Sequence, residues 1–320
     1  MQAERQTTKH VFLVRPRHFG SNSETAGSNA FQQHVSSSAG EIQMRALAEF
    51  DGLYQALRSV GVVPIVFDDT DDPVKPDAVF PNNWVSFHSD GTVYLYPMEA
   101  PSRRIERRAD IVEALSARNG FHVREIIDLS AAEGDGLFLE GTGSMVLDRV
   151  NRVIYAALSS RTHMSVLADF AQQADYDITV FDAADSAGRP VYHTNVMMAI
   201  GSSFAVLCAD AITDSLKRKT VVARLAASGR EIVEISIPQM ESFAGNLLEL
   251  ATESGEAVIV LSGEAYAALT VDQRNALARF GQVLPIAIDT IEKVGGGSVR
   301  CMLAEVFLPL SPVPSRNGLS

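Results

Sequence analysis

The 320-residue sequence contains only two cysteines, Cys208 and Cys301. Two cysteines cannot build a disulfide framework, and their spacing is not that of a metal site, so we expect neither. No apolar run approaches the ~18 residues that a membrane-spanning helix needs. The first ten residues are polar and lack the apolar core of a signal peptide, so the sequence predicts a cytoplasmic protein.

Basic residues are scarce relative to acidic ones. There are 27 Lys and Arg against 39 Asp and Glu, which gives a net charge of −12. This balance argues against a nucleic acid or an anionic membrane as partner. It is compatible with a small cationic or zwitterionic substrate, and we expect no cofactor. The sequence leaves homo-oligomer formation open.

The overall composition, with 46% hydrophobic and 21% charged residues, is typical of a globular protein. No linker or change in composition divides the chain, so we expect a single α/β domain over residues 1–320. Residues 19–40 are rich in Ser, Gly and Asn and predict a long loop. Such a loop is uncommon inside a compact domain and is often functional, for example as a lid.

A pattern of strand, strand, helix and strand repeats along the chain, and such repeats indicate a modular architecture. A fifth copy lacks its last three elements, which residues 11–67 supply. The sequence therefore predicts a five-bladed α/β propeller of ββαβ units whose ring is closed by the two ends of the chain. The copies span residues 78–129, 137–181, 191–235 and 243–288, and the fifth begins at 299–308.

One polar residue occupies an equivalent position in the predicted first strand of each unit. These residues follow one another at intervals of 57, 53, 53 and 55 residues: Asn83, Glu140, His193, Asn246 and Cys301. Equivalent positions of a radial repeat point toward a common axis. We therefore expect these side chains to converge on one central pocket, although we interpret Asn246 as structural.

Cys301 follows the run Gly295-Gly296-Gly297, which leaves room for a ligand beside the backbone. Taken alone, Cys301 has an ordinary buried thiol as its alternative interpretation, because free cysteines are among the most buried residues. Together with the other polar positions it predicts a nucleophile, since a thiolate is a capable protein nucleophile near neutral pH. His193 is the predicted acid and base, and Glu140 is predicted to orient it.

Several motifs resemble the guanidine-modifying (pentein) superfamily of arginine deiminases, dimethylarginine dimethylaminohydrolases and amidinotransferases. They are residues 76–83 (Pro-Asp-Ala-Val-Phe-Pro-Asn-Asn), 101–104 (Pro-Ser-Arg-Arg), 139–141 (Leu-Glu-Gly) and 158–162 (Leu-Ser-Ser-Arg-Thr), together with His193 and Cys301. The chain is most similar to the arginine-deiminase-related citrulline-utilisation (CtlX) branch, through Phe-Pro-Asn-Asn-Trp and the loop 22–32. The resemblance implies that Arg103 and Arg161 bind a substrate carboxylate. The alternative is that both are exposed on helices.

Two positions depart from the family pattern. Members that act on a guanidinium usually have Glu-Asp or Arg-Asp where this chain has Asn82 and Asn83, and many deiminases have His-x-Asp where it has His193-Thr194-Asn195. An asparagine cannot neutralise a cation, but its NH₂ can donate to a neutral carbonyl. Asp77 remains as a carboxylate that binds the substrate. For the two asparagines, a simple turn is the alternative.

The sequence therefore predicts a cysteine-dependent hydrolase of a ureido or guanidino group, with L-citrulline as the favoured substrate and ornithine, ammonia and CO₂ as products. Arginine deimination, arginine dihydrolysis and dimethylarginine hydrolysis are the alternatives within the superfamily. Two alternatives come from other classes. One is a cysteine peptidase, for which no oxyanion or peptide-cleft motif is present, and the other is a non-catalytic binding protein with the pentein fold.

Overall fold

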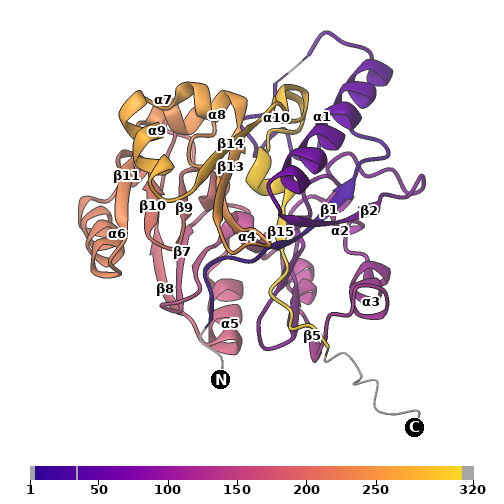
Figure 1. Ribbon diagram of the computed structural model, residues 1–320, viewed down its shortest axis with the longest axis horizontal. Coiled ribbons are helices and arrows are strands. Elements are labelled where there is room, and N and C mark those ends of the chain that lie inside the picture. The colour runs from indigo at the N-terminus through magenta and orange to yellow at the C-terminus, as the bar shows by residue number, and fades with distance from the viewer. Residues whose placement is uncertain (1–3, 34, 312–320) are drawn as a thin grey trace.

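The computed structural model describes residues 4–33 and 35–311, and the strands in this part of the chain form five separate three-stranded sheets (Figure 1). In each sheet the middle strand pairs antiparallel with one neighbour and parallel with the other. With the middle strand second, the sheets are β3–β4–β5 (Val85–Phe87, Thr92–Leu95, Glu125–Asp128), β6–β7–β8 (Val146–Asp148, Val153–Ala157, Asp177–Phe181), β9–β10–β11 (Met198–Ile200, Phe204–Leu207, Glu231–Glu234), β12–β13–β14 (Leu248–Ala251, Ala257–Ser262, Gln282–Ile286) and β15–β1–β2 (Ala304–Glu305, His10–Arg15, Val63–Asp68).

Helices connect the middle strand of each sheet to its parallel neighbour, because a parallel pair needs a crossover. They are α1 (Ala39–Ser59), α2 (Pro101–Arg104) with α3 (Ala109–Ala117), α5 (Met164–Ala174), α6 (Ser215–Ala227), and α8 (Gly263–Ala268) with α9 (Val271–Ala278). The predicted order of strand, strand, helix and strand is therefore present in all five units. The arrangement is compatible with a five-unit pseudo-symmetric fold, and it is not a closed barrel.

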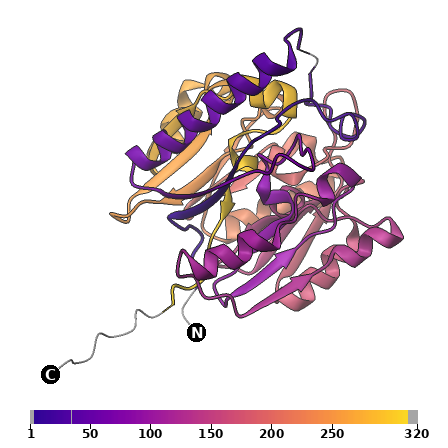
Figure 2. The same ribbon diagram turned by 90° about the vertical axis from the view of Figure 1, so that its right-hand side faces the viewer.

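The two ends of the chain share one sheet, as predicted. Strand β15 pairs antiparallel with β1, so that Val11 lies opposite Glu305 and Phe12 lies opposite Ala304. Figure 2 shows helix α1 lying along the C-terminal part of the chain, next to α10 (Asp289–Gly295) and β14. Buried aromatic side chains join this unit to the next one: Phe12 packs edge-on against Trp84 at a centroid distance of 5.9 Å.

The first strands of the units are shorter than predicted. The predicted strands begin near residues 78, 137, 191, 243 and 299, but in four of the units a single helical turn precedes the strand: η1 (Pro81–Asn83), α4 (Gly141–Ser144), η3 (Thr194–Val196) and η5 (Val299–Met302). These turns pack against one another: α4 contacts η1 and η3, and η1 contacts η5. A Cβ at Gly141 would lie 2.4 Å from the Asn82 carbonyl oxygen, and the φ of +47° at Gly141 is one that glycine adopts without strain.

Two helices predicted as continuous, over residues 102–119 and 265–280, are each divided in two. In the second case Thr270 starts a new helix, because its hydroxyl accepts from the Gln273 backbone N–H and the Gln273 side chain accepts from the Thr270 N–H. Besides the turns η1, α4, η3 and η5, four further short helices in the described residues were not predicted: η2 (Ser130–Asp135), η4 (Ala209–Ala211), α7 (Ile237–Glu241) and α10. Within the described ranges, no helix has the length and apolar character needed to cross a membrane.

Candidate active site

Cys301 lies in the single turn η5, after the three glycines. These glycines let the chain pass close to the Phe80 ring: a Cβ at Gly295 or Gly297 would lie 2.8 Å or 2.9 Å from it. Gly296 has a φ of +65°, in the left-handed region that favours glycine. The glycine run therefore has a packing reason, and it brings Cys301, which is only 3% exposed, to the wall of a cavity.

The empty space of this cavity, counted together with the solvent at its open side, is about 280 Å³. Six of the eight predicted site residues line it: Asp77, Asn83, Arg103, Arg161, His193 and Cys301. The other two are fully buried nearby. Glu140 contacts His193, and the Asn82 amide donates to the Thr142 hydroxyl at 3.3 Å. The repeat thus predicted a common location for residues that are more than 200 positions apart in the chain.

His193 and Glu140 form a buried pair. The distance from His193 Nε2 to Glu140 Oε2 is 2.9 Å, and both side chains are at most 2% exposed. Burial lowers the pKa of His193, although the hydrogen bond and charge of Glu140 oppose this effect. For Glu140 burial opposes ionisation, but Arg161, His193 and Arg103 outweigh it and hold its pKa below the usual value. The resting pair is therefore a neutral imidazole beside a carboxylate, as a proton acceptor requires.

The arginines Arg103 and Arg161 are 3% and 2% exposed, so the alternative that they lie exposed on helices is wrong. Arg103 is already engaged: it makes a bidentate pair with Glu106, at 3.0 and 2.9 Å, and Nη1 donates to Asn83 Oδ1 at 2.9 Å. Burial raises the pKa of Glu106 to about 7 despite this pair. Arg103 therefore positions Asn83, and its binding of a substrate carboxylate stays a prediction.

Arg161 is held by the N-terminal loop. Its Nη2 donates to the Thr25 carbonyl at 3.2 Å and to the Ser28 hydroxyl at 2.8 Å. It also lies 3.5 Å from Glu140 Oε2, and its guanidinium sits over the Tyr192 ring at 5.2 Å. These contacts place one fixed positive charge on the wall of the cavity, where a substrate carboxylate could be bound.

Two polar atoms that belong to the cavity wall lack a hydrogen-bond partner within the described residues. They are Asn83 Nδ2 and Asp77 Oδ1, and both side chains are 2% exposed. The Asn83 amide has a defined orientation, because Arg103 can only donate and so requires the oxygen on its side. Asp77 Oδ2 accepts from the Asn22 amide at 2.8 Å. Burial raises the pKa of Asp77, and Arg103 partly offsets that effect. These two residues thus provide one unpaired donor and one unpaired acceptor beside the cavity.

Two asparagines contact the sulfur itself. Asn246 Nδ2 lies 3.4 Å and Asn195 Nδ2 lies 3.6 Å from Cys301 Sγ. The interpretation of Asn246 as purely structural overlooked this contact. Its position in the repeat was the available signal, since Asn246 occupies the position equivalent to Cys301 in the fourth unit.

The loop between β1 and α1 covers the cavity. The family motif over residues 22–32 contains the residues that make the contacts, although sequence reasoning assigned them no role. Thr25 and Asn29 line the cavity. Asn29 Nδ2 donates to the Gly296 carbonyl at 3.0 Å, and Gln32 Nε2 donates to the Gly295 carbonyl at 3.3 Å. The loop is therefore fastened to the glycine run beside Cys301. Its opening as a lid stays a prediction.

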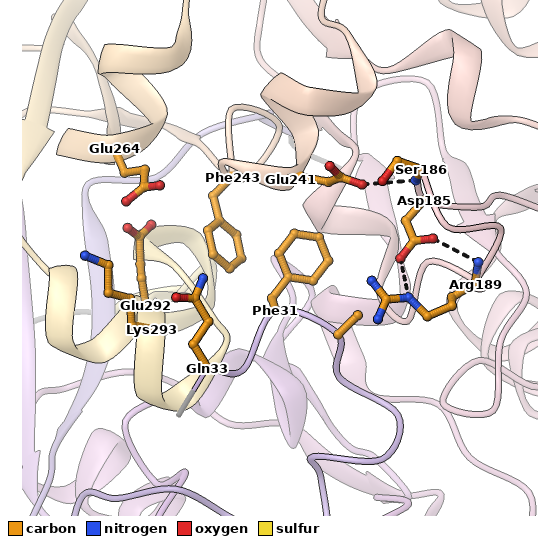
Figure 3. A pocket seen from close by; sticks show the side chains of 11 residues that line it. Phe31, Gln33, Asp185, Ser186, Arg189, Glu241, Phe243, Glu264, Glu292 and Lys293 are labelled. Atoms are coloured by element: carbon orange, nitrogen blue, oxygen red, sulfur yellow. Dashed lines mark hydrogen bonds and ion pairs between the residues drawn. The ribbon is translucent and has the colours of Figure 1, made fainter. Parts of the chain in front are cut away.

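A second, larger cavity, with about 740 Å³ of empty space counted in the same way, is lined by Ala30, Phe31 and Gln33 of the same loop (Figure 3). Phe31 lies on its wall and packs against Tyr192 of the smaller cavity, with a centroid distance of 5.7 Å. The wall also carries Phe243 and the carboxylates of Asp185, Glu241, Glu264 and Glu292. None of the predicted site residues lines this larger cavity, whereas six of them line the smaller one. The larger cavity is therefore not the site that the sequence predicts.

The second cysteine, Cys208, lies elsewhere. It is fully buried at the end of β10, and burial raises its pKa to about 11. A thiol with this pKa is almost entirely protonated at neutral pH and is a poor nucleophile. Of the two cysteines, Cys301 is therefore the better candidate for the nucleophile.

Residues 15–308 match the family model for N,N dimethylarginine dimethylhydrolase, eukaryotic. No curated protein matches the sequence. Among solved structures, ArgZ, an arginine dihydrolase from the ornithine–ammonia cycle in cyanobacteria, superposes with a TM-score of 0.72 at 19% identity over 95% of this chain. The chain covers only 41% of that ArgZ chain.

The N-terminal domain of ArgZ with bound substrate gives a TM-score of 0.72 at 18% identity, with coverage of 94% of this chain and 99% of that domain. A dimethylarginine dimethylaminohydrolase, solved as an adduct with S-methyl-L-thiocitrulline, gives 0.62 at 16% identity, with coverage of 93% and 99%. At these identities the similarity establishes the fold. This chain therefore has the fold of a single domain of ArgZ.

Proposed function

Because the chain belongs to the N,N dimethylarginine dimethylhydrolase family, within the guanidine-modifying (pentein) hydrolases, we propose that it cleaves the ureido group of a small amino acid, with L-citrulline as the preferred substrate. The products are ornithine, ammonia and CO₂. We further propose that its five units form a closed ring around Cys301, with residues 1–320 as one domain. Cys301 is the nucleophile, and His193 is the acid and base.

The observation that carries the substrate proposal is the orientation of Asn83. Arg103 holds its oxygen, so its NH₂ is on the other side of the amide, next to Gly143, and this group is buried without a partner within the described residues. A buried donor without an acceptor costs ~1–3 kcal/mol, which a substrate carbonyl would relieve. A ureido group carries such a carbonyl, whereas a guanidinium carries only N–H donors. The wall therefore favours the neutral ureido head group.

The residues support a two-step hydrolysis. The proton of Cys301 passes to neutral His193 through a water molecule, because these two side chains are not hydrogen-bonded to each other, and the thiolate attacks the ureido carbon. The bond from this carbon to the ornithine δ-nitrogen breaks as His193 returns the proton to the departing amine, leaving a carbamoyl thioester on Cys301. A water molecule then gives a proton to His193 as its oxygen attacks the thioester carbon. The bond from this carbon to the sulfur breaks, carbamic acid leaves, and His193 returns the proton to the thiolate. Carbamic acid decomposes to CO₂ and ammonia.

Arginine is the second candidate, and a specific observation favours it as well. Asp77 Oδ1 is a buried acceptor on the cavity wall without a partner, and a guanidinium could donate to it. ArgZ, which has the same fold, is an arginine dihydrolase. In this case Asp77 and Glu140 would balance the cation without help from position 83.

The deciding experiment is incubation of the purified protein with L-citrulline, L-arginine and methylated arginines, with ornithine, citrulline and ammonia quantified over time. We expect ornithine and ammonia from citrulline at a rate well above that from arginine. The Cys301→Ser protein is the matched blank, because it removes the thiolate and keeps the size of the side chain. Faster turnover of arginine than of citrulline would contradict the substrate assignment and leave the nucleophile assignment standing.

A further inference from the structure

The sulfur of Cys301 is surrounded by neutral hydrogen-bond donors. Asn246 Nδ2 and Asn195 Nδ2 reach it at 3.4 and 3.6 Å, both within the longer limit usual for sulfur. Both asparagines are at most 1% exposed. In the part of the chain that the structure describes, no lysine, arginine or histidine side chain is hydrogen-bonded to this sulfur. The direct hydrogen bonds to a thiolate here therefore come from the two carboxamides.

The orientation of the Asn246 carboxamide is fixed by the backbone. The N–H of Arg300 donates to Asn246 Oδ1 at 3.1 Å. Since a backbone N–H can only donate, the oxygen must face Arg300, and the NH₂ must face Cys301. The same NH₂ donates to the Asn195 carbonyl at 3.0 Å. Asn246 thus connects three of the segments that surround the sulfur and holds one N–H directed at it.

The hydrogen bond between Asn246 and Cys301 differs between the thiol and the thiolate. The distance from Cys301 Sγ to Asn246 Oδ1 is 3.8 Å, so the neutral thiol can donate weakly to that oxygen. The NH₂, at the shorter distance, suits the thiolate, because hydrogen bonds to a charged acceptor are stronger than those to a neutral one. The arrangement therefore favours the charged form over the neutral form.

We propose that Asn246 and Asn195 form a carboxamide pair that stabilises the thiolate of Cys301 and fixes the direction from which its sulfur attacks. The inference rests on the proposed function for its catalytic meaning, but the hydrogen bonds can be tested without any substrate. The neutral side chain of Asn195 also matters. An aspartate at position 195 would place a negative carboxylate about where the amide now contacts the sulfur, and this charge would repel the thiolate.

The test is the pH dependence of iodoacetamide alkylation between pH 5 and 10, measured by intact mass in a Cys208→Ser background so that one thiol remains. The variants are Asn246→Leu and Asn195→Asp, and the matched control is Asn82→Leu, which removes a buried carboxamide that contacts Thr142. Other charged or titratable groups around the sulfur are the same in all variants: Asp77, Arg103, Arg161, Tyr192 and His193 on the cavity wall, with Glu140 behind them.

We expect the apparent pKa of Cys301 to rise by about one to two units in Asn246→Leu and in Asn195→Asp, since one charge-assisted hydrogen bond corresponds to roughly that shift. The alkylation rate at pH 7 should fall by about tenfold or more, because only the thiolate reacts. Asn82→Leu should leave both quantities near those of the Cys208→Ser parent. Thermal unfolding identifies any variant that fails to fold, and Asn195→Asp then serves as the second, shape-conserving variant.

An unchanged pKa of Cys301 in a folded Asn246→Leu or Asn195→Asp protein would overturn the inference. A failure of the proposed function looks different. In that case Cys301→Ser would retain activity, or no ureido or guanidino compound would be consumed, while the asparagine variants would still shift the thiol titration.

Discussion

The substitution Asn83→Asp converts an amide into a carboxylate with little change of shape. It therefore tests the effect of charge at position 83 without a change in side-chain size. In Asn83→Asp the oxygen that accepts from Arg103 Nη1 at 2.9 Å is retained. The atom that changes is the buried Nδ2, which lies next to Gly143 and has no partner within the described residues. A group that donates to a ureido carbonyl thus becomes one that accepts from a guanidinium.

The expected magnitude follows from these two changes. With citrulline the variant loses a hydrogen bond and directs an unpaired oxygen at the ureido carbonyl, a loss of about 1.5 kcal/mol. With arginine it gains a charge-assisted bond of about 2 kcal/mol. The ratio of kcat/KM for citrulline to that for arginine should therefore fall by about 3.5 kcal/mol, or roughly 300-fold, since ~1.4 kcal/mol corresponds to tenfold.

The assay measures kcat/KM for both substrates at pH 8, where an aspartate is ionised. Asn82→Asp is the control: Asn82 donates to Thr142 and is not among the residues that line the cavity. This control should change the substrate ratio far less. A ratio that stays constant in Asn83→Asp, or that moves toward citrulline, would refute the assignment of position 83 to the head group.

The repeat was readable in the sequence because a hydrophobic strand pattern and a polar position return at nearly constant spacing. This periodicity predicted the order of elements in the five sheets and the common location of His193, Glu140 and Cys301. It could not predict that these residues precede the strands. That geometry depends on contacts between units, such as the close approach of Gly141 to the Asn82 carbonyl.

Side-chain partners were harder to predict than positions. The Pro-Ser-Arg-Arg motif indicated a carboxylate-binding Arg103, but the structure pairs this residue with Glu106, three positions later, and with Asn83. A charged run is usually solvated, and only the resemblance of the motif indicated that this arginine lies in the site. The orientation of Asn83, which carries the substrate proposal, exists only through that contact.

Further predictions concern the nucleophile, the base and one buried carboxylate. Cys301→Ser should fold and lose nearly all turnover, whereas Cys208→Ser should keep it; near-normal turnover in Cys301→Ser would exclude covalent catalysis. His193→Gln should lower kcat on the order of a hundredfold or more, and normal turnover would make this histidine structural. Glu292 is 4% exposed and accepts from the Ser298 hydroxyl. Burial raises its pKa from 4.5 to about 7. The folded state therefore holds the proton more tightly than the unfolded state, so the associated stability is complete below pH 4.5 and is lost as the pH rises through 7. This rise in the pKa of Glu292, from 4.5 to about 7, corresponds to at most ~3.4 kcal/mol. In urea unfolding, Glu292→Gln should match the parent near pH 4.5 and exceed it in free energy of unfolding at pH 8. An equal pH dependence of parent and variant would show that Glu292 titrates normally.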